Sequence, residues 1–115
     1  MHDTELGAAY THAVWRVRPG QEDAFVAAWR AIGEAFAALP RRPLWGTLLR
    51  SEREPGVFYS FGPWASAADV EAMRADPAAR AAIARAMELC AEATPGACTL
   101  VAHMDLRSAA PTPAA

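Results

Sequence analysis

The stretch 56–70 constrains the fold of this chain most, because it encodes a strand, a stop and a helix start in direct succession. Residues 57–61 are apolar and aromatic, which is typical of a buried strand. Gly62-Pro63 is expected to end that strand, since proline has no N–H to donate to a sheet. Ser66 stands where a helix N-cap belongs, with an acidic residue three positions later. Trp64 is therefore fixed between a strand and a helix, either as a core residue or as the wall of a ligand pocket.

The rest of the chain alternates in the same way between strand and helix patterns. Strands are predicted at 8–17, 44–51 and 97–105, and a helix at 21–39, where apolar residues recur at helical spacing. The helix that Ser66 opens is expected to break at Asp76-Pro77, with Asp76 as a new N-cap and Pro77 at the first helical position.

Three local features sharpen this interpretation. Gly33 costs the first helix about 1 kcal/mol relative to alanine and indicates close packing at that position. Thr94-Pro95-Gly96 is expected to turn the chain into the last strand. Cys90 and Cys98 flank that turn and could approach each other, but two free thiols are favoured in a reducing compartment.

The resulting order, β-α-β-β-α-β, predicts an α+β fold of the ferredoxin-like, split βαβ type. Four strands form one antiparallel sheet, and the helices cover one face. Residues 8–105 are expected to form one domain, with 1–7 and 106–115 as flexible termini. The other sheet face carries apolar side chains, so a homodimer that buries this face is predicted.

Composition excludes several classes of function. The 115 residues carry a formal net charge of -2 with no basic stripe, so nucleic acid is not an expected partner. No apolar run approaches the roughly 20 residues of a membrane span, and the N-terminus lacks the pattern of a signal peptide. The expectation is therefore a cytoplasmic protein with no membrane partner.

Three motifs resemble those of the antibiotic biosynthesis monooxygenase family. Residues 17–25 are similar to its first strand-to-helix junction, residues 61–69 to its Trp-x-Ser-x-x-acid junction, and Asp76-Pro77 falls where the family breaks its second helix. The resemblance covers roughly residues 8–105 and implies a dimeric α+β barrel. This scaffold hosts cofactor-free oxygenases, haem-degrading enzymes, quinol oxidases, isomerases and proteins of unknown role, so the fold alone does not fix the chemistry.

The haem-degrading branch of the family implies an Asn on the first strand, and a Trp and a His on the broken helix. The corresponding positions are Ala13, Met73 and Ile83, and none matches. Without an axial histidine near Ile83, haem iron lacks an evident protein ligand. No Gly-rich phosphate loop occurs either, so the prediction is a protein without cofactor.

The cofactor-free oxygenase branch matches in part. Trp64 agrees with the family's junction tryptophan, whereas its Asn four residues earlier is Ser60 here. Its Tyr on the following helix is replaced by Val70, and its His on the second strand by Arg50. The resemblance therefore implies the scaffold together with a different substrate or reaction.

The residues suggest two kinds of functional group. His12 and His103 are predicted to lie on neighbouring strands, where a neutral imidazole can act as a base, and Arg50 can pair with an anion. Structural roles remain open alternatives, and the two histidines lack a third ligand for a metal. The predicted substrate-binding residues are Trp64, Ser60, Trp15, Tyr59, Phe58, Val70 and Met73, with Trp45 as a further wall.

The leading functional hypothesis is a cofactor-independent monooxygenase. It would oxidise a small aromatic substrate, polyketide-like or quinol, with dioxygen, because an aromatic anion can itself pass an electron to dioxygen in a dry, anion-stabilising pocket. The alternatives are a dimer that only binds a small aromatic molecule, and an isomerase or cyclase on the same scaffold.

Overall fold

The computed structural model describes residues 5–107. Its elements follow the order β-α-β-β-α-α-β: β1 (Ala9–Val17), α1 (Glu22–Ala37), β2 (Thr47–Arg50), β3 (Val57–Trp64), α2 (Ala67–Ala75), α3 (Pro77–Glu88) and β4 (Cys90–Thr99).

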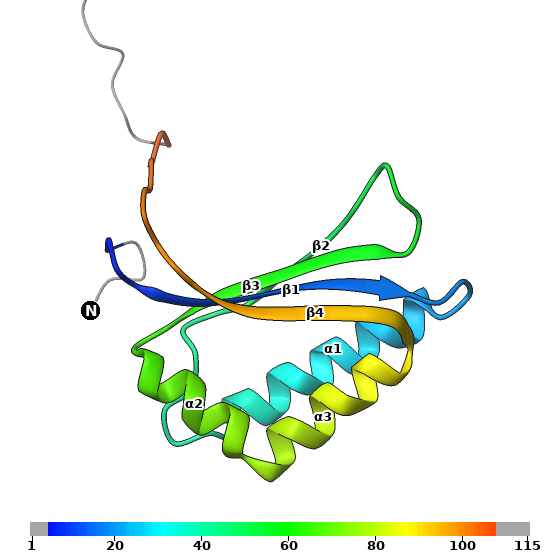
Figure 1. Ribbon diagram of the computed structural model, residues 1–115, viewed down its shortest axis with the longest axis horizontal. Coiled ribbons are helices and arrows are strands. Elements are labelled where there is room, and N and C mark those ends of the chain that lie inside the picture. Colours follow the sequence, from blue (N-terminus) through cyan, green and yellow to red (C-terminus); the bar gives the residue numbers. More distant parts are fainter. Residues whose placement is uncertain (1–4, 108–115) are drawn as a thin grey trace, which may run out of the picture.

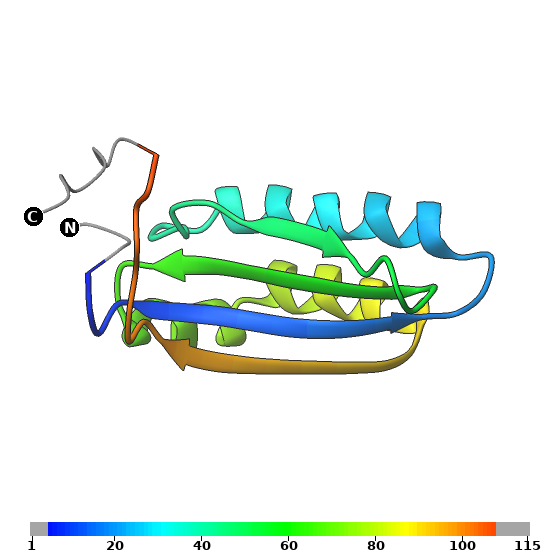
Figure 2. The same cartoon turned by 90° about the horizontal axis from the view of Figure 1, so that it is seen from above.

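The strands form one antiparallel sheet in the order β2-β3-β1-β4. All helices lie on one face of it, with α1 and α3 side by side and α2 near the end where β3 stops (Figure 1 and Figure 2). The predicted four-stranded α+β fold of ferredoxin-like order is therefore confirmed, including the hairpin of β2 and β3. Among residues 5–107, no helix is long and apolar enough to cross a membrane.

The predicted helix caps are present. The Ser66 hydroxyl accepts a hydrogen bond from the Asp69 N–H at 3.2 Å, and the Asp76 carboxylate accepts one from the Ala79 N–H at 2.9 Å. Pro77 opens α3, where its missing N–H leaves no helical bond unmade. These bonds fix the break between α2 and α3 and so set the angle at which α2 meets the sheet.

Gly62-Pro63 does not end the third strand, contrary to the prediction. β3 continues to Trp64, and Pro63 stands opposite Tyr10 of β1. The Pro63 carbonyl accepts the Leu44 N–H at 3.1 Å, on the side of β3 that faces away from β1, and the Pro63 nitrogen points to that same side. The pairing of β3 with β2 ends at Phe61, before Pro63 is reached. The missing donor therefore breaks no ladder bond.

The last strand begins earlier than predicted and contains the expected turn. β4 runs through Pro95 and Gly96, with Pro95 opposite Ala13. Leu100 exchanges hydrogen bonds with Gly7 and Ala8, so its N–H points toward β1. Backbone N–H groups point alternately to the two sides of a strand, and Pro95 lies five residues before Leu100, so its nitrogen points away from β1. The Pro95 nitrogen thus faces the free edge of the sheet, where a strand tolerates proline.

This shift corrects the interpretation of both cysteines. Cys90 opens β4 opposite Val17, and Cys98 lies near the other end of the same strand, opposite Tyr10, so the two do not flank a turn. Eight residues of extended chain separate them by roughly 26 Å, so they cannot form a disulfide. Both are free thiols.

Two groups of buried side chains fill the layer between sheet and helices. In the larger group, Phe25 of α1 lies 5.2 Å from the ring of Trp15 and 5.0 Å from that of Phe58. The smaller group contains Trp64, which is only 2% exposed, with Val70, Met73 and Ala79. Phe36 and Ile83 pack against both groups.

The opposite face of the sheet, which we call the open face, carries no covering element among residues 5–107 (Figure 1). Strand alternation and register place on it the apolar and aromatic residues Tyr10, Val14, Leu49, Tyr59 and Phe61. After β4 the chain turns away on the same side of the sheet. Val101, Met104 and Leu106 in this segment are each more than 70% exposed.

Candidate active site

Two neighbouring cavities lie on the helix side of the sheet. The first has a volume of about 510 Å³ and reaches Trp45, so we call it the Trp45 cavity. The second, of about 410 Å³, reaches Met73 and is called the Met73 cavity. They share a sheet wall and an α1 wall, made by Thr11, Trp29, Ile32, Phe36 and Ser60. Each is large enough for a small aromatic molecule.

The shared sheet wall carries two hydroxyl groups, and each accepts a hydrogen bond from a tryptophan. The Trp64 indole N–H donates to Thr11 Oγ1 at 3.0 Å, and the Trp15 indole N–H donates to Ser60 Oγ at 2.9 Å. Both tryptophans are at least 95% buried. The indoles thus satisfy their own polar atoms and hold the two hydroxyl oxygens in place.

The loop between α1 and β2 covers one side of the Trp45 cavity. Leu44 and Trp45 of this loop border the cavity, and the Trp45 ring lies 6.2 and 6.1 Å from the ring centres of Tyr10 and Phe61. Gly62 permits this close approach, because a Cβ there would collide with the Trp45 carbonyl. Arg41 fixes the same loop to α2 through an ion pair of 2.8 Å with Asp69, whose side chain is buried.

Among residues 5–107, four arginines and no carboxylate line the two cavities. Arg30 and Arg42 border the Trp45 cavity, and Arg74 and Arg80 border the Met73 cavity. Arg74 also forms an exposed ion pair of 2.9 Å with Glu71. The excess of cationic groups around an aromatic interior favours a ligand that is flat, largely apolar and negatively charged.

Four of the predicted binding residues meet at these cavities. Ser60 lines both, Trp64 lines the Trp45 cavity, and Trp15 and Met73 line the Met73 cavity. The predicted wall Trp45 borders the Trp45 cavity, but its ring packs against Tyr10 and Phe61 on the open face. The roles of the other four residues in binding stay predictions, but the structure brings their side chains to one place between sheet and helices.

Three predicted binding residues lie elsewhere. Phe58 faces the helices but is packed between Phe25 and Arg50, outside both cavities. Tyr59 alternates with it and lies on the open face, opposite Val14. Val70 packs beside Trp64 and lines a third pocket, described below. Strand alternation explains the first two positions: adjacent residues of β3 cannot face the same cavity.

Of the three predicted catalytic residues, His12 alone borders one of these two cavities. His103 lies beyond the end of β4, because that strand ends at Thr99, and the residue opposite His12 is Gly96. His12 borders the Met73 cavity, but alternation in β1 places its side chain on the open face, where it is exposed. Arg50 ends β2 with its guanidinium 5.2 Å from the Phe58 ring centre, and it lines neither cavity. His103 therefore does not lie on a strand beside His12, as the sequence pattern had predicted.

Thr11 and the residues that α1 and α3 contribute were not predicted from the sequence. Thr11 precedes Ala13 and Trp15 by two and four residues, so alternation alone would have placed it on the helix side of β1. Trp29 and Phe36 belong to the apolar stripe of α1. A helix packed against a sheet and a helix that borders a cavity show the same sequence pattern of apolar residues. No sequence signal distinguishes these two cases.

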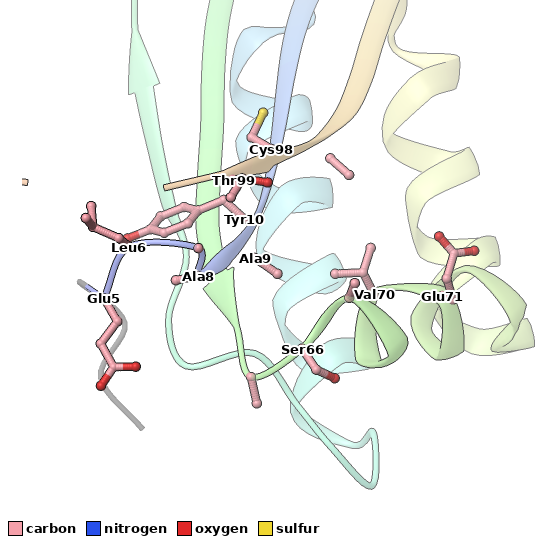
Figure 3. A pocket seen from close by; sticks show the side chains of 14 residues that line it. Glu5, Leu6, Ala8, Ala9, Tyr10, Ser66, Val70, Glu71, Cys98 and Thr99 are labelled. Carbon is pink, nitrogen blue, oxygen red and sulfur yellow. The ribbon is translucent and has the colours of Figure 1, made fainter. Parts of the chain in front are cut away.

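A third pocket, of about 360 Å³, opens at the end of the sheet where β1 begins (Figure 3). Ser66, Val70 and Glu71 border it from the start of α2, and Tyr10 and Cys98 from the strands. Its two carboxylates, Glu5 and Glu71, disfavour an anionic ligand. It also lacks the buried hydroxyl–indole pairs of the other two cavities.

Comparison with known proteins places the fold. Residues 9–85, well over half of the chain, match the family described as antibiotic biosynthesis monooxygenase. The chain belongs to this family. No curated protein matches it.

Solved structures of similar fold include members with and without a described reaction. A variant of SnoaB, described as a cofactor-independent oxygenase from Streptomyces nogalater, is 17% identical, with a TM-score of 0.71 over 88% of this chain and 98% of that one. A candidate antibiotic biosynthesis monooxygenase from Caulobacter crescentus is 23% identical, with a TM-score of 0.70 over 86% and 92% of the two chains. A conserved protein from Methanosarcina mazei is 11% identical, with a TM-score of 0.70 over 80% and 91%. At these identities the likeness establishes the fold alone.

Proposed function

We propose that this protein is a cofactor-independent monooxygenase that oxidises a phenolic aromatic substrate, polyketide-like or quinol, with dioxygen. The observation that carries the proposal is the pair of adjoining cavities walled by Trp15, Trp29, Phe36 and Trp64, in a member of a family named for this activity. Aromatic walls hold a flat substrate and exclude bulk water, which is most of what this chemistry requires.

The reaction is balanced without a further reductant. The substrate loses a proton, and the resulting anion passes one electron to dioxygen, which gives a substrate radical and superoxide. These combine at carbon into a peroxide anion, which takes up a proton in place of the one first lost and becomes a hydroperoxide. Loss of water from the hydroperoxide leaves a carbonyl. A CH₂ group and O₂ thus become C=O and H₂O, with one oxygen atom retained. The protein's tasks are to bind the ring and to stabilise the anion.

The first proton leaves without a base supplied by the cavity walls. Within the described part of the chain the lining residues include no Asp or Glu, and the imidazole of His12, which borders the Met73 cavity, belongs to the open face. This arrangement suits a substrate that is acidic enough to lose its proton to water. Arginines at the cavity borders favour the anion once it has formed.

Oxygen uptake tests this function. The probe is 1,8-dihydroxyanthrone, a flat phenol with an oxidisable CH₂ group, followed with an oxygen electrode and by mass spectrometry under ¹⁸O₂. We expect uptake above the rate in buffer and above that with heat-denatured protein, with one ¹⁸O atom in the product. Tight binding of the anthrone without faster uptake would favour the alternative, a protein that only binds small aromatic molecules.

We further propose a homodimer in which two open faces pack together. The apolar and aromatic residues of this face lie on a sheet that no element among residues 5–107 covers, and a small chain gains much by burying such a surface. The exposed apolar segment after β4 rises on the same side of the sheet (Figure 1), so a second copy would cover both. The two helix layers would then lie on the outside.

A further inference from the structure

We propose that the hydroxyls of Thr11 and Ser60 together bind the phenolate oxygen of the substrate, and that Trp64 and Trp15 act as positioning residues for them. The assignment rests on the proposed function and deepens it, because it names the donors that hold the substrate's anion.

The hydrogen-bond pattern determines what each hydroxyl can offer. A hydroxyl has one hydrogen to donate and two lone pairs to accept with. The indole N–H groups of Trp64 and Trp15 occupy a lone pair of Thr11 Oγ1 and Ser60 Oγ, at 3.0 and 2.9 Å. Neither hydroxyl donates to an acceptor within residues 5–107. Each therefore has its hydrogen free for a ligand.

The register of the sheet brings the two donors together. Thr11 stands opposite Gly62, and Ser60 stands opposite Ala13. The hydroxyls are thus diagonal neighbours on adjacent strands and on the same face, with Cα atoms roughly 7–8 Å apart and Cβ atoms somewhat closer. The proposal places the phenolate oxygen between them, where it accepts a hydrogen bond from each. Both line the Trp45 cavity and the Met73 cavity, so they lie where the two spaces adjoin.

The surroundings favour an anion over a neutral phenol at this point. A hydroxyl donates a stronger hydrogen bond to an anion when its own oxygen already accepts a hydrogen bond, because hydrogen bonds in a chain polarise one another. Ser60 is only 8% exposed, so water competes weakly for its hydrogen. The charged groups that border the cavities are Arg30, Arg42, Arg74 and Arg80, and all are cationic. A phenol bound here is expected to have its pKa lowered.

A purely structural role is the competing explanation. The two hydroxyls would then exist only to satisfy buried indole N–H groups, and they would stabilise the fold without discriminating between phenolate and phenol. The two explanations agree on protein stability, so stability cannot separate them. They differ in the ionisation of a bound ligand.

The test uses 7-hydroxycoumarin, whose phenolate and phenol have distinct absorption spectra, and 7-methoxycoumarin, which has no proton to lose. Each is titrated with the full-length protein at several pH values, and the pKa of the bound hydroxycoumarin is read from its spectrum. We expect the wild-type protein to bind both probes and to lower the pKa of the first by about one unit or more.

Thr11→Val and Thr11→Ser form the decisive pair of variants. Valine keeps the shape of threonine but has no hydroxyl, whereas serine keeps the hydroxyl. For valine we expect phenolate binding to weaken about 10-fold or more and the probe pKa to rise towards its free value, with methoxycoumarin binding nearly unchanged. Thr11→Ser should restore both the phenolate affinity and the lowered pKa of the bound probe. Ser60→Ala should act like Thr11→Val on the second donor.

Thr11→Val also leaves the Trp64 N–H without its acceptor, so some loss of stability is expected. The serine variant and the methoxycoumarin titration show whether the folded fraction keeps its pocket. An unchanged probe pKa in wild-type protein, or equal losses for the phenolate and the methoxy probe in Thr11→Val, would overturn the assignment. So would failure of the wild-type protein to bind either probe. The oxygenase proposal is judged separately by anthrone-dependent oxygen uptake.

Discussion

Gly33 offers a direct test of whether the Trp45 cavity is a ligand site. It lies in the interior of α1 and borders this cavity, and a Cβ built on it meets no atom within 4 Å. The glycine's place inside a helix predicted close packing at this position, and that prediction was wrong. An added side chain at this position enters empty space.

Gly33→Ala is expected to stabilise the protein. Glycine in a helix interior costs about 1 kcal/mol relative to alanine, and no contact has to yield here. Since unfolding entropy is about 2 cal/mol/K per residue, a 115-residue chain should gain roughly 4 °C in Tm. Circular dichroism during heating measures this, and a lower Tm would show that the space beside Gly33 is not empty in solution.

Gly33→Leu keeps the helix propensity and fills the cavity. Leucine forms helices nearly as well as alanine, so the stability should again rise or stay level. Its side chain would occupy the space between the loop of Trp45 and the sheet wall, and binding of 7-methoxycoumarin should weaken at least 10-fold. Glu34→Leu is the matched control, because Glu34 is exposed and lines neither cavity. Equal affinity in Gly33→Leu and wild-type protein would refute the Trp45 cavity as the ligand site.

Two further predictions concern assembly and pH. Light scattering at micromolar concentration should give twice the 12.3 kDa mass of one chain. Tyr59→Lys places a charge opposite Leu49 on the open face and should shift the protein to a monomer. A monomeric wild-type protein would refute the interface. Burial raises the pKa of the Cys90 thiol above its usual 9.0, against a smaller lowering by Arg18. The unfolded chain therefore loses the Cys90 thiol proton at a lower pH than the folded chain. The contribution of Cys90 to the free energy of unfolding is fully present below pH ~9 and is lost as the pH rises through the folded pKa. Chemical denaturation between pH ~8 and ~10 should show that the free energy of unfolding falls less steeply with pH for Cys90→Ala than for the wild-type protein. Equal slopes of this free energy against pH would refute the effect.

The elements that depend on neighbouring residues were predictable from the sequence. Ser66 and Asp76 cap their helices because a short polar side chain reaches an N–H three residues ahead, whatever the rest of the chain does. Pro77 fits the first position of a helix for an equally local reason. The order of strands and helices follows from such signals, and so does the fold class.

The two strand boundaries marked by prolines were not predictable in this way. Whether a strand tolerates Pro63 or Pro95 depends on which of its sides is paired at that residue. This is set by β2 ending early in one case and by β4 lying at the sheet edge in the other. The misplacement of β4 then moved Cys90 and His103 to wrong elements. One non-local feature, the edge position of a strand, thus accounts for several errors in the predicted site.

The cavities depend on non-local packing even more strongly, and Trp64 shows the consequence for chemistry. The family resemblance implies this tryptophan as a binding residue, and its indole N–H is the polar group that it could offer a ligand. In the folded chain that N–H is already bonded to Thr11, 53 residues away in sequence, so it is not available. The donor that faces the ligand is then the threonine hydroxyl, and the tryptophan contributes its flat face and the orientation of that hydroxyl. A motif in the sequence shows which side chains meet at a site, whereas the register of the sheet decides which of their atoms remain free to act.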